Sequence, residues 1–174
     1  MNKEDGFTLV EMLVAMVLSA ILLTLSAGAL RTYWHNRSLH GAQDQAVTQL
    51  RQLQARVMSE SHPLVYGARF TPGSSSWSTV EYQPAAGGNP EKCTQTPRTF
   101  ESNVRVASAS FSNATGVTSF CSTQLGVPAS QLVFFFARGT ATEGNVVLES
   151  ANLPGRSLGF TVKPMTGRVQ VVDS

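Results

Sequence analysis

The chain has 174 residues, of which 42% are hydrophobic and 14% are charged, and its formal net charge is +2. A chain of this length forms one compact domain and not two once an apolar segment near its start is set aside. The small positive charge permits weak attraction to polyanions but does not by itself indicate a polyanion-binding protein.

The first predicted element is an apolar helix over residues 7–30, which is long enough to cross a bilayer. It carries one carboxylate, Glu11, close to its start. A charged side chain at the centre of a spanning helix raises the free energy of membrane insertion by about 2.5–3.5 kcal/mol. A carboxylate within such a helix is therefore interpreted as a functional residue, and Glu11 is a candidate. The alternative is a glutamate at the membrane interface, where the positive end of the helix dipole favours it.

The stretch Gly6-Phe7-Thr8-Leu9-Val10-Glu11 resembles the cleavage and assembly signal of type IV pilins and pseudopilins. The resemblance implies that a prepilin peptidase cuts between Gly6 and Phe7, removes a leader peptide of residues 1–6, and methylates the new amine of Phe7. It also implies that Glu11 neutralises the terminal amine of a neighbouring subunit in a filament core. Such pairing would offset part of the cost of burying both charges.

The orientation of the helix follows from the resemblance and not from charge. Glu4 and Asp5 outweigh Lys3 before the helix, and Arg31 and Arg37 lie beyond its other end, so the positive-inside rule is ambiguous. The resemblance places the N-terminus in the cytoplasm and the rest of the chain outside the cytoplasmic membrane. After assembly the protein would lie in an extracellular or periplasmic filament.

Gly28 lies near the outer end of the apolar helix. Many type IV pilins have a proline at a comparable depth, where the helix bends or melts during assembly. Glycine lowers helix stability by about 1 kcal/mol, so the resemblance implies that Gly28 serves in its place. A small residue that allows close helix packing explains it equally well.

The helix is expected to continue through residues 31–60 as an amphipathic segment. Ala46, Leu50, Leu53 and Val57 recur at steps of three and four residues, which is the period of a helix with one apolar face. Apolar and amphipathic halves together give about 50 residues, or roughly 75 Å. Residues 61–63 (Ser-His-Pro) should end it.

Residues 61–174 are predicted to form a β-rich globular domain, because short alternating or apolar runs are separated by turn residues. The residues 84–97 are read as a loop that carries Cys93. The fold class is therefore α+β, with a long N-terminal helix packed on a small antiparallel β-sandwich. The predicted strands are 64–70, 77–83, 100–111, 117–121, 131–137, 145–149, 157–163 and 168–172.

Cys93 and Cys121 are the two cysteines, and in a domain outside the cytoplasm they are expected to form a disulfide. Two buried free thiols are the alternative. The chain has no cluster of cysteine and histidine with zinc-ligand spacing and no local catalytic motif. We therefore expect no metal, no cofactor and no enzymatic activity.

The C-terminal part sharpens the resemblance. A phenylalanine-rich strand (Leu132-Val-Phe-Phe-Phe), a polar hairpin, a further strand and a final hairpin ending in Gly167-Arg168 resemble the GspH/FimT-like minor pilins and pseudopilins. Some of these bind DNA through a basic C-terminal hairpin with a Gly-Arg-x-Arg motif, of which this chain keeps only the first arginine. The candidate DNA contacts are Arg138, Arg156, Lys163 and Arg168, and a solvated hairpin rim is the favoured alternative.

The resemblance implies a structural and assembly-priming subunit of a type IV pilus or a type II secretion pseudopilus. Its partners would be other pilin or pseudopilin subunits, the prepilin peptidase and an inner-membrane assembly platform. The alternative is a subunit at the pilus tip that binds DNA for uptake or serves in adhesion. A membrane-anchored domain that never polymerises is a third hypothesis.

Overall fold

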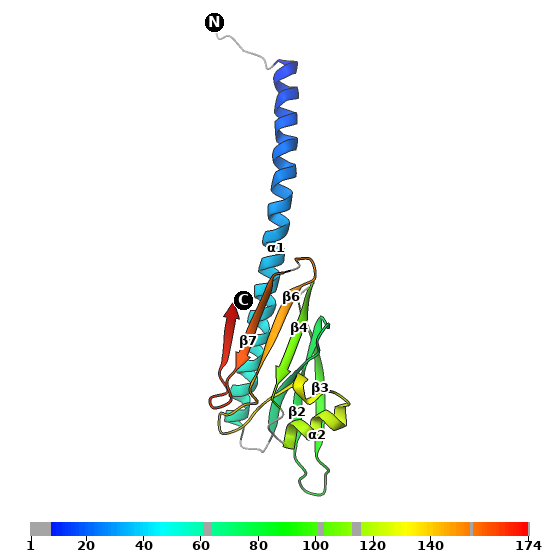
Figure 1. Ribbon diagram of the computed structural model, residues 1–174, viewed down its shortest axis with the longest axis vertical. Helices are drawn as coiled ribbons and strands as arrows, with labels where there is room; N and C mark the ends of the chain where they lie inside the picture. The colour runs from blue at the N-terminus through cyan, green and yellow to red at the C-terminus, as the bar shows by residue number, and fades with distance from the viewer. Residues whose placement is uncertain (1–7, 61–63, 101–102, 113–115, 154, 174) are drawn as a thin grey trace.

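The computed structural model describes residues 8–60, 64–100, 103–112, 116–153 and 155–173, and it shows a long helix that projects from a β-domain (Figure 1). The predicted leader, Gly6, Phe7 and the expected helix stop at residues 61–63 lie outside the described residues. The elements are α1 (Leu9–Ser59), β1 (Val65–Phe70), β2 (Ser76–Gln83), β3 (Lys92–Thr99), β4 (Val104–Phe111), α2 (Gly116–Leu125), a 3-10 turn η1 (Ala129–Gln131), β5 (Leu132–Phe135), β6 (Gly144–Ser150), β7 (Ser157–Val162) and β8 (Val169–Asp173).

The eight strands form two four-stranded antiparallel sheets. The strand order is β3-β2-β1-β5 in the first sheet and β4-β6-β7-β8 in the second. The turn between β1 and β2 connects the first sheet to the second. The Gly73 amide donates to the Val106 carbonyl, and the Val106 amide donates to the Ser74 carbonyl. The predicted α+β class with antiparallel strands is confirmed.

The second half of α1 packs on both sheets. Its buried positions include Leu39, Ala46, Leu50 and Val57, which follow the predicted apolar face. They share one core with the inner faces of the sheets, where Phe70 stacks on Trp77 at a centroid distance of 5.4 Å. This core fixes the direction in which α1 leaves the β-domain.

Three polar side chains of α1 hold the C-terminal strands. The Gln43 amide donates to the Gly159 carbonyl at 2.6 Å, Arg51 donates to the Val169 carbonyl at 3.2 Å, and Gln54 donates to the Thr166 carbonyl at 2.9 Å. Gln43 is buried, and a buried polar group needs such a partner to avoid a desolvation cost. The second sheet is therefore attached to α1 by hydrogen bonds as well as by apolar packing.

Helix α2 corrects one prediction, because residues 117–121 were expected to be a strand. The helix covers the outer face of the first sheet, where Cys121 and Thr118 are buried, and Val117 and Phe120 pack on the second, smaller core. The spacing of Val117, Phe120 and Cys121 is helical. Their high strand propensity favoured the wrong assignment.

The disulfide between Cys93 and Cys121 connects β3 to α2, with a Cα–Cα distance of 5.6 Å. The bond confirms the predicted pairing. Cys93 also shows that part of the expected loop 84–97 is wrong, because Lys92–Thr99 forms β3. Pro97 argued against a strand, but β3 is an edge strand, and proline is tolerated there.

Gly67 allows β1 and the edge strand β5 of the first sheet to lie close together. A Cβ atom at this position would overlap the Val133 carbonyl oxygen and would lie 2.6 Å from Cδ1 of Phe134. Phe134 is fully buried on the α2 side of the sheet. A glycine is therefore required where β1 passes the apolar strand β5.

Candidate functional site

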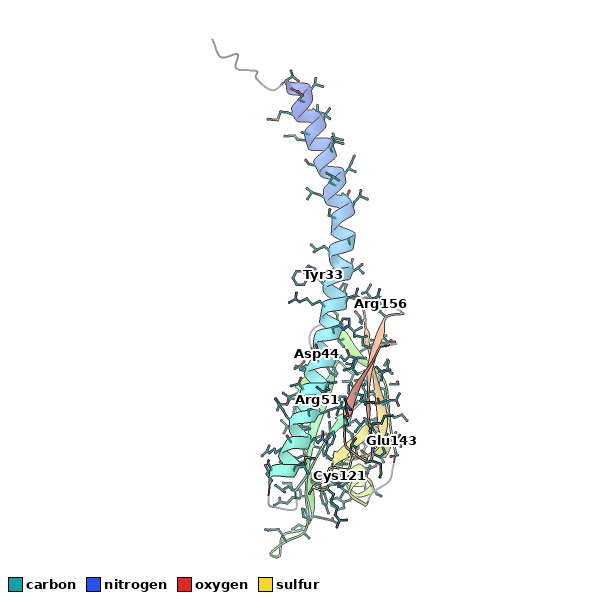
Figure 2. The ribbon with its side chains drawn as sticks, turned by 90° about the vertical axis from the view of Figure 1, so that its left-hand side faces the viewer. Tyr33, Asp44, Arg51, Cys121, Glu143 and Arg156 are labelled. Carbon is teal, nitrogen blue, oxygen red and sulfur yellow. A yellow bond between two sulfur atoms is a disulfide. The ribbon has the colours of Figure 1, made fainter. Side chains whose placement is uncertain are left out.

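The first half of α1 is the most unusual surface of the protein. Figure 2 shows its side chains projecting from the helix without contact to the β-domain. Large apolar residues there are exposed by half or more, and α1 is long and apolar enough to cross a membrane. They are Leu9, Val10, Met12, Leu13, Val14, Met16, Val17, Leu18, Ile21, Leu22, Leu23, Leu25 and Leu30. Apolar patches of this size mark a surface that is covered by lipid or by protein.

Glu11 turns back toward the start of α1. Its Oε2 atom accepts hydrogen bonds from the Thr8 amide at 3.0 Å and from the Thr8 hydroxyl at 3.1 Å. The Glu11 amide donates in return to the Thr8 hydroxyl at 3.3 Å, which completes a capping box. Sequence reasoning treated Glu11 as an assembly residue or as a glutamate at the membrane interface, although the Thr-x-x-Glu spacing also predicts this cap.

The geometry leaves part of the Glu11 carboxylate free. Both bonds from Thr8 end on Oε2, and no hydrogen bond from any described residue reaches Oε1. The carboxylate lies in the first turn of α1. An external cation can therefore approach Glu11 without breaking the cap.

Gly28 lies inside the continuous helix, and a Cβ atom there would meet no other atom within 4 Å. Around it, hydroxyl groups bond to carbonyls of their own helix: Thr24 to Ile21 at 2.7 Å, Ser26 to Leu22 at 2.8 Å and Thr32 to Gly28 at 3.3 Å. These side chains need no outside partner. The melting role of Gly28 stays a prediction.

The four candidate DNA contacts do not lie together. Lys163 and Arg168 are joined by a backbone hydrogen bond, and Gly139, next to Arg138, lies beside Gly167. Arg156 lies at the other end of the second sheet, because its loop joins the ends of β6 and β7 that pair as Glu149 and Ser157. The structure therefore separates Arg156 from the other three residues.

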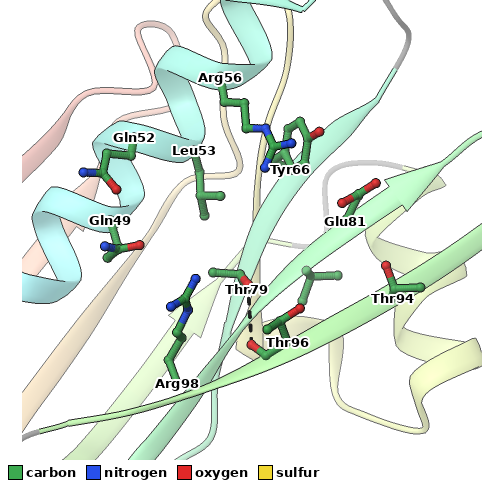
Figure 3. A pocket seen from close by; sticks show the side chains of 11 residues that line it. Gln49, Gln52, Leu53, Arg56, Tyr66, Thr79, Glu81, Thr94, Thr96 and Arg98 are labelled. Carbon is green, nitrogen blue, oxygen red and sulfur yellow. Dashed lines mark hydrogen bonds between the residues drawn. The ribbon is translucent and has the colours of Figure 1, made fainter.

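A polar groove lies between α1 and the first sheet (Figure 3), and its volume is about 290 Å³. The pairing of β2 with β3 places Thr79 opposite Thr96 and Glu81 opposite Thr94, so these side chains share the face that looks toward α1. Gln49, Gln52, Leu53 and Arg56 form the helix wall. Sequence reasoning missed this groove, because its residues come from four elements and carry no local motif.

One wall of the groove is a fixed cluster around Tyr66. The guanidinium of Arg56 lies 4.6 Å from the Tyr66 ring centre and donates from Nε to Glu60 at 2.6 Å. The Tyr66 hydroxyl donates to the other oxygen of Glu60 at 2.7 Å. Burial and this hydrogen bond raise the pKa of Tyr66 to about 12, so it stays neutral and keeps the cluster intact at ordinary pH.

A metal site receives no support from the described part of the chain. No group of three or more histidine, cysteine, aspartate or glutamate side chains that could hold an ion occurs there. Both cysteines are bonded to one another. The remaining candidate surfaces are therefore the exposed half of α1, the three cations and the groove.

Comparison with known proteins gives one family match. Residues 1–27 match the prokaryotic N-terminal methylation motif, which includes Gly6, Phe7 and Glu11. No curated protein matches the chain. The crystal structure of the type IV minor pilin FimU from Pseudomonas aeruginosa is similar with a TM-score of 0.49 and 12% sequence identity, over 80% of this chain and 92% of that chain. The first 27 residues therefore carry a prokaryotic N-terminal methylation motif, and the apolar helix α1 begins within it and continues beyond it.

Proposed function

We propose that the protein is a minor pilin or pseudopilin, which is a structural and assembly-priming subunit of a type IV pilus or a type II secretion pseudopilus. The observation that carries this proposal is the uneven burial of one continuous helix. The first half of α1 is apolar and exposed, while the second half is fixed in the core of the β-domain. Such a helix needs an apolar partner at its free end only.

Two environments can cover the exposed half of α1. A bilayer covers it before assembly, because the helix satisfies its own backbone hydrogen bonds. Helices of other subunits cover it in a filament. The proposal therefore includes a single crossing of the cytoplasmic membrane with the N-terminus inside, and transfer to an extracellular or periplasmic filament through an inner-membrane assembly platform.

Processing and pairing complete the proposal. A prepilin peptidase cuts between Gly6 and Phe7 and methylates Phe7, within the stretch that matches the methylation motif. The free oxygen of Glu11 then accepts from the Phe7 amine of a neighbouring subunit. Pairing offsets the cost of burying each charge alone, so it selects the register in which the subunits meet.

Intact mass spectrometry of the membrane-extracted protein and of sheared filaments tests this function. We expect loss of residues 1–6 together with the gain of one methyl group, in both samples. Gly6→Val should keep the full-length mass in the membrane and remove the protein from filaments, whereas the matched Gly28→Ala should be processed normally. An unprocessed wild-type chain, or a cut near Gly28, contradicts the proposal.

DNA binding is a second candidate function. Arg138, Lys163 and Arg168 lie near the C-terminal end of α1, away from its apolar half, because Gln54 bonds to Thr166 and Gly139 lies beside Met58. Each phosphate contact adds salt-dependent affinity. A gel shift over a salt series should show binding that weakens in Arg168→Ala but not in Arg156→Ala, which changes an arginine at the opposite end. Equal loss in both variants, or no binding at low salt, ends this candidate.

A further inference from the structure

The polar groove between α1 and the first sheet offers hydrogen-bonding groups that the fold does not use. Among the described residues, no hydrogen bond or ion pair reaches the Arg98 guanidinium, the Gln49 and Gln52 amides or the Thr94 hydroxyl. Arg98 is exposed on β3, and Figure 3 shows it rising toward the side of the groove where Gln49 lies. These groups are available to a ligand.

Charge is distributed unevenly along the groove. Arg98 and the two glutamines lie on one side, whereas Glu81 and Thr94 lie on the other (Figure 3). Arg56 adds little free charge, because Glu60 binds its Nε atom at 2.6 Å. The groove therefore presents one uncompensated cation at one end and one carboxylate at the other.

This distribution narrows the chemistry of the ligand. A polyanion such as an acidic peptide or a nucleic acid would place negative charge against Glu81, which is unfavourable. An apolar ligand would leave the amides, the hydroxyls and both charges without partners. A ligand with one acidic group and several hydroxyls can pair with the cation, the carboxylate, the amides and the hydroxyls of the groove, because a hydroxyl both donates and accepts.

We propose that the groove binds a carbohydrate that carries a carboxylate, with the carboxylate on Arg98 and ring hydroxyls on Gln49, Thr94 and Glu81. A guanidinium binds a carboxylate through two parallel hydrogen bonds. Leu53 is the apolar side chain of α1 in the groove and would lie against the C–H face of a sugar ring. The groove volume of about 290 Å³ indicates a short saccharide and not a large ligand.

The fixed wall of the groove supports this use. Arg56, Tyr66 and Glu60 bind one another, so that side of the groove is ordered before any ligand arrives. Such preorganisation lowers the entropic cost of binding. Arg98 and Thr94 of β3 lie across the groove from α1, whereas Gln49 and Gln52 share the helix wall with Arg56, so a ligand meets both ordered and adaptable groups.

Calorimetric titration of the full chain in phospholipid nanodiscs tests the proposal, since sugar-based detergents would compete. The probe is cellobiouronic acid, a disaccharide with a single carboxylate, and its methyl ester is the matched probe without charge. We expect saturable binding of the acid, and about tenfold weaker binding of the ester, because charge-assisted hydrogen bonds are stronger than neutral ones.

Variants separate the site from general charge effects. Arg98→Gln should weaken binding of the acid about tenfold and leave binding of the ester nearly unchanged. Glu81→Gln, which keeps the acceptor oxygen, should change the affinity for the ester little and should strengthen binding of triglutamate. The control is Arg156→Gln, which removes an arginine at the far end of the second sheet. Melting temperatures of all variants should match the wild type.

Three results would overturn the proposal. The first is no saturable binding of cellobiouronic acid up to about 10 mM, which is weaker than any specific site requires. The second is equal or tighter binding of triglutamate by the wild-type protein, which would assign the groove to an acidic peptide. The third is an equal loss of affinity in Arg98→Gln and Arg156→Gln, which would show attraction to net charge only.

Discussion

The two halves of α1 form one uninterrupted helix, yet their polar side chains find hydrogen-bond partners in different places. In the exposed half, Thr24, Ser26 and Thr32 bond back to carbonyls of the same helix. In the packed half, Gln43, Arg51 and Gln54 bond across to the second sheet. The hydroxyl groups of the exposed half are therefore satisfied within the helix, as an apolar environment requires. The polar side chains of the packed half obtain their hydrogen-bond partners from the β-domain.

Only the second half of α1 is buried by the rest of the chain. Leu50 is fully buried by the β-domain, whereas Leu22 is 64% exposed in the isolated chain. The same residue type stabilises the fold of the domain at one position and is available for lipid or other subunits at the other position. Changes in the two halves should consequently be separable by experiment.

The largest effect is expected for Glu11→Ala. It should reduce the amount of subunit in filaments at least tenfold, because the amine of a neighbouring subunit would be buried without a partner. The melting temperature of the β-domain should stay unchanged, since Glu11 makes no contact with it. Quantitative immunoblotting of sheared filaments and thermal unfolding measure the two effects. Glu143→Ala, an exposed carboxylate of the β-domain, is the control and should assemble normally.

The pair Leu50→Ala and Leu22→Ala tests the division of burial directly. Leu50→Ala should lower the free energy of unfolding of the β-domain by about 2–5 kcal/mol, the range for a cavity in a packed core. Leu22→Ala should change it by less than about 0.5 kcal/mol. Denaturant unfolding monitored by Trp77 fluorescence measures both. Equal losses would show that the halves are not independent.

Gln43 should stabilise the folded protein through its hydrogen bond to the second sheet. Gln43→Met keeps a similar volume and leaves the Gly159 carbonyl without its donor, so the free energy of unfolding should fall by about 1–3 kcal/mol. Gln45→Met, an exposed neighbour on α1, is the matched control and should be nearly neutral. If both variants have the same free energy of unfolding in denaturant, the hydrogen bond to Gly159 makes no measurable contribution to stability.

The smallest effect concerns pH at the end of the packed half. The pKa of Tyr66 is raised from 10.0 to about 12 in the folded protein, so its contribution to stability is complete below pH 10 and is lost as pH rises through 12. Between pH 9.5 and 11 the stability difference between the wild type and Tyr66→Phe should fall by about 1 kcal/mol. Urea unfolding at several pH values measures it, and a constant difference would contradict the assignment.

Most of the fold could be predicted from the sequence because long periodic segments carry strong signals. The helix period of Ala46, Leu50 and Val57 predicted the packed half of α1, and the alternating pattern predicted a strand that includes the residues of β4. Short segments failed where local preferences conflicted with tertiary contacts. Val117–Cys121 has strand-forming residues but is helical, because a helix there covers the second core and lets Cys121 reach Cys93.

The candidate sites divide in the same way. The methylation motif is a contiguous stretch, so it could be read directly from residues 6–11. The groove could not, because Gln49, Glu81 and Arg98 meet only after α1 packs on the first sheet. The separation of Arg156 from Lys163 and Arg168 also depends on how the strands pair. Sites of this second kind need the pairing register, which single-sequence patterns do not supply.

The disulfide between Cys93 and Cys121 has a mechanical consequence. The two cysteines are 28 residues apart in sequence, and the enclosed segment includes most of β3 and all of β4. When the chain is pulled from its two ends, tension passes through the sulfur atoms and bypasses this segment. Full extension of the oxidised chain should be about 90 Å shorter than that of the reduced chain. A subunit of this design would keep a compact, unstretched loop even under load that unravels the strands on either side.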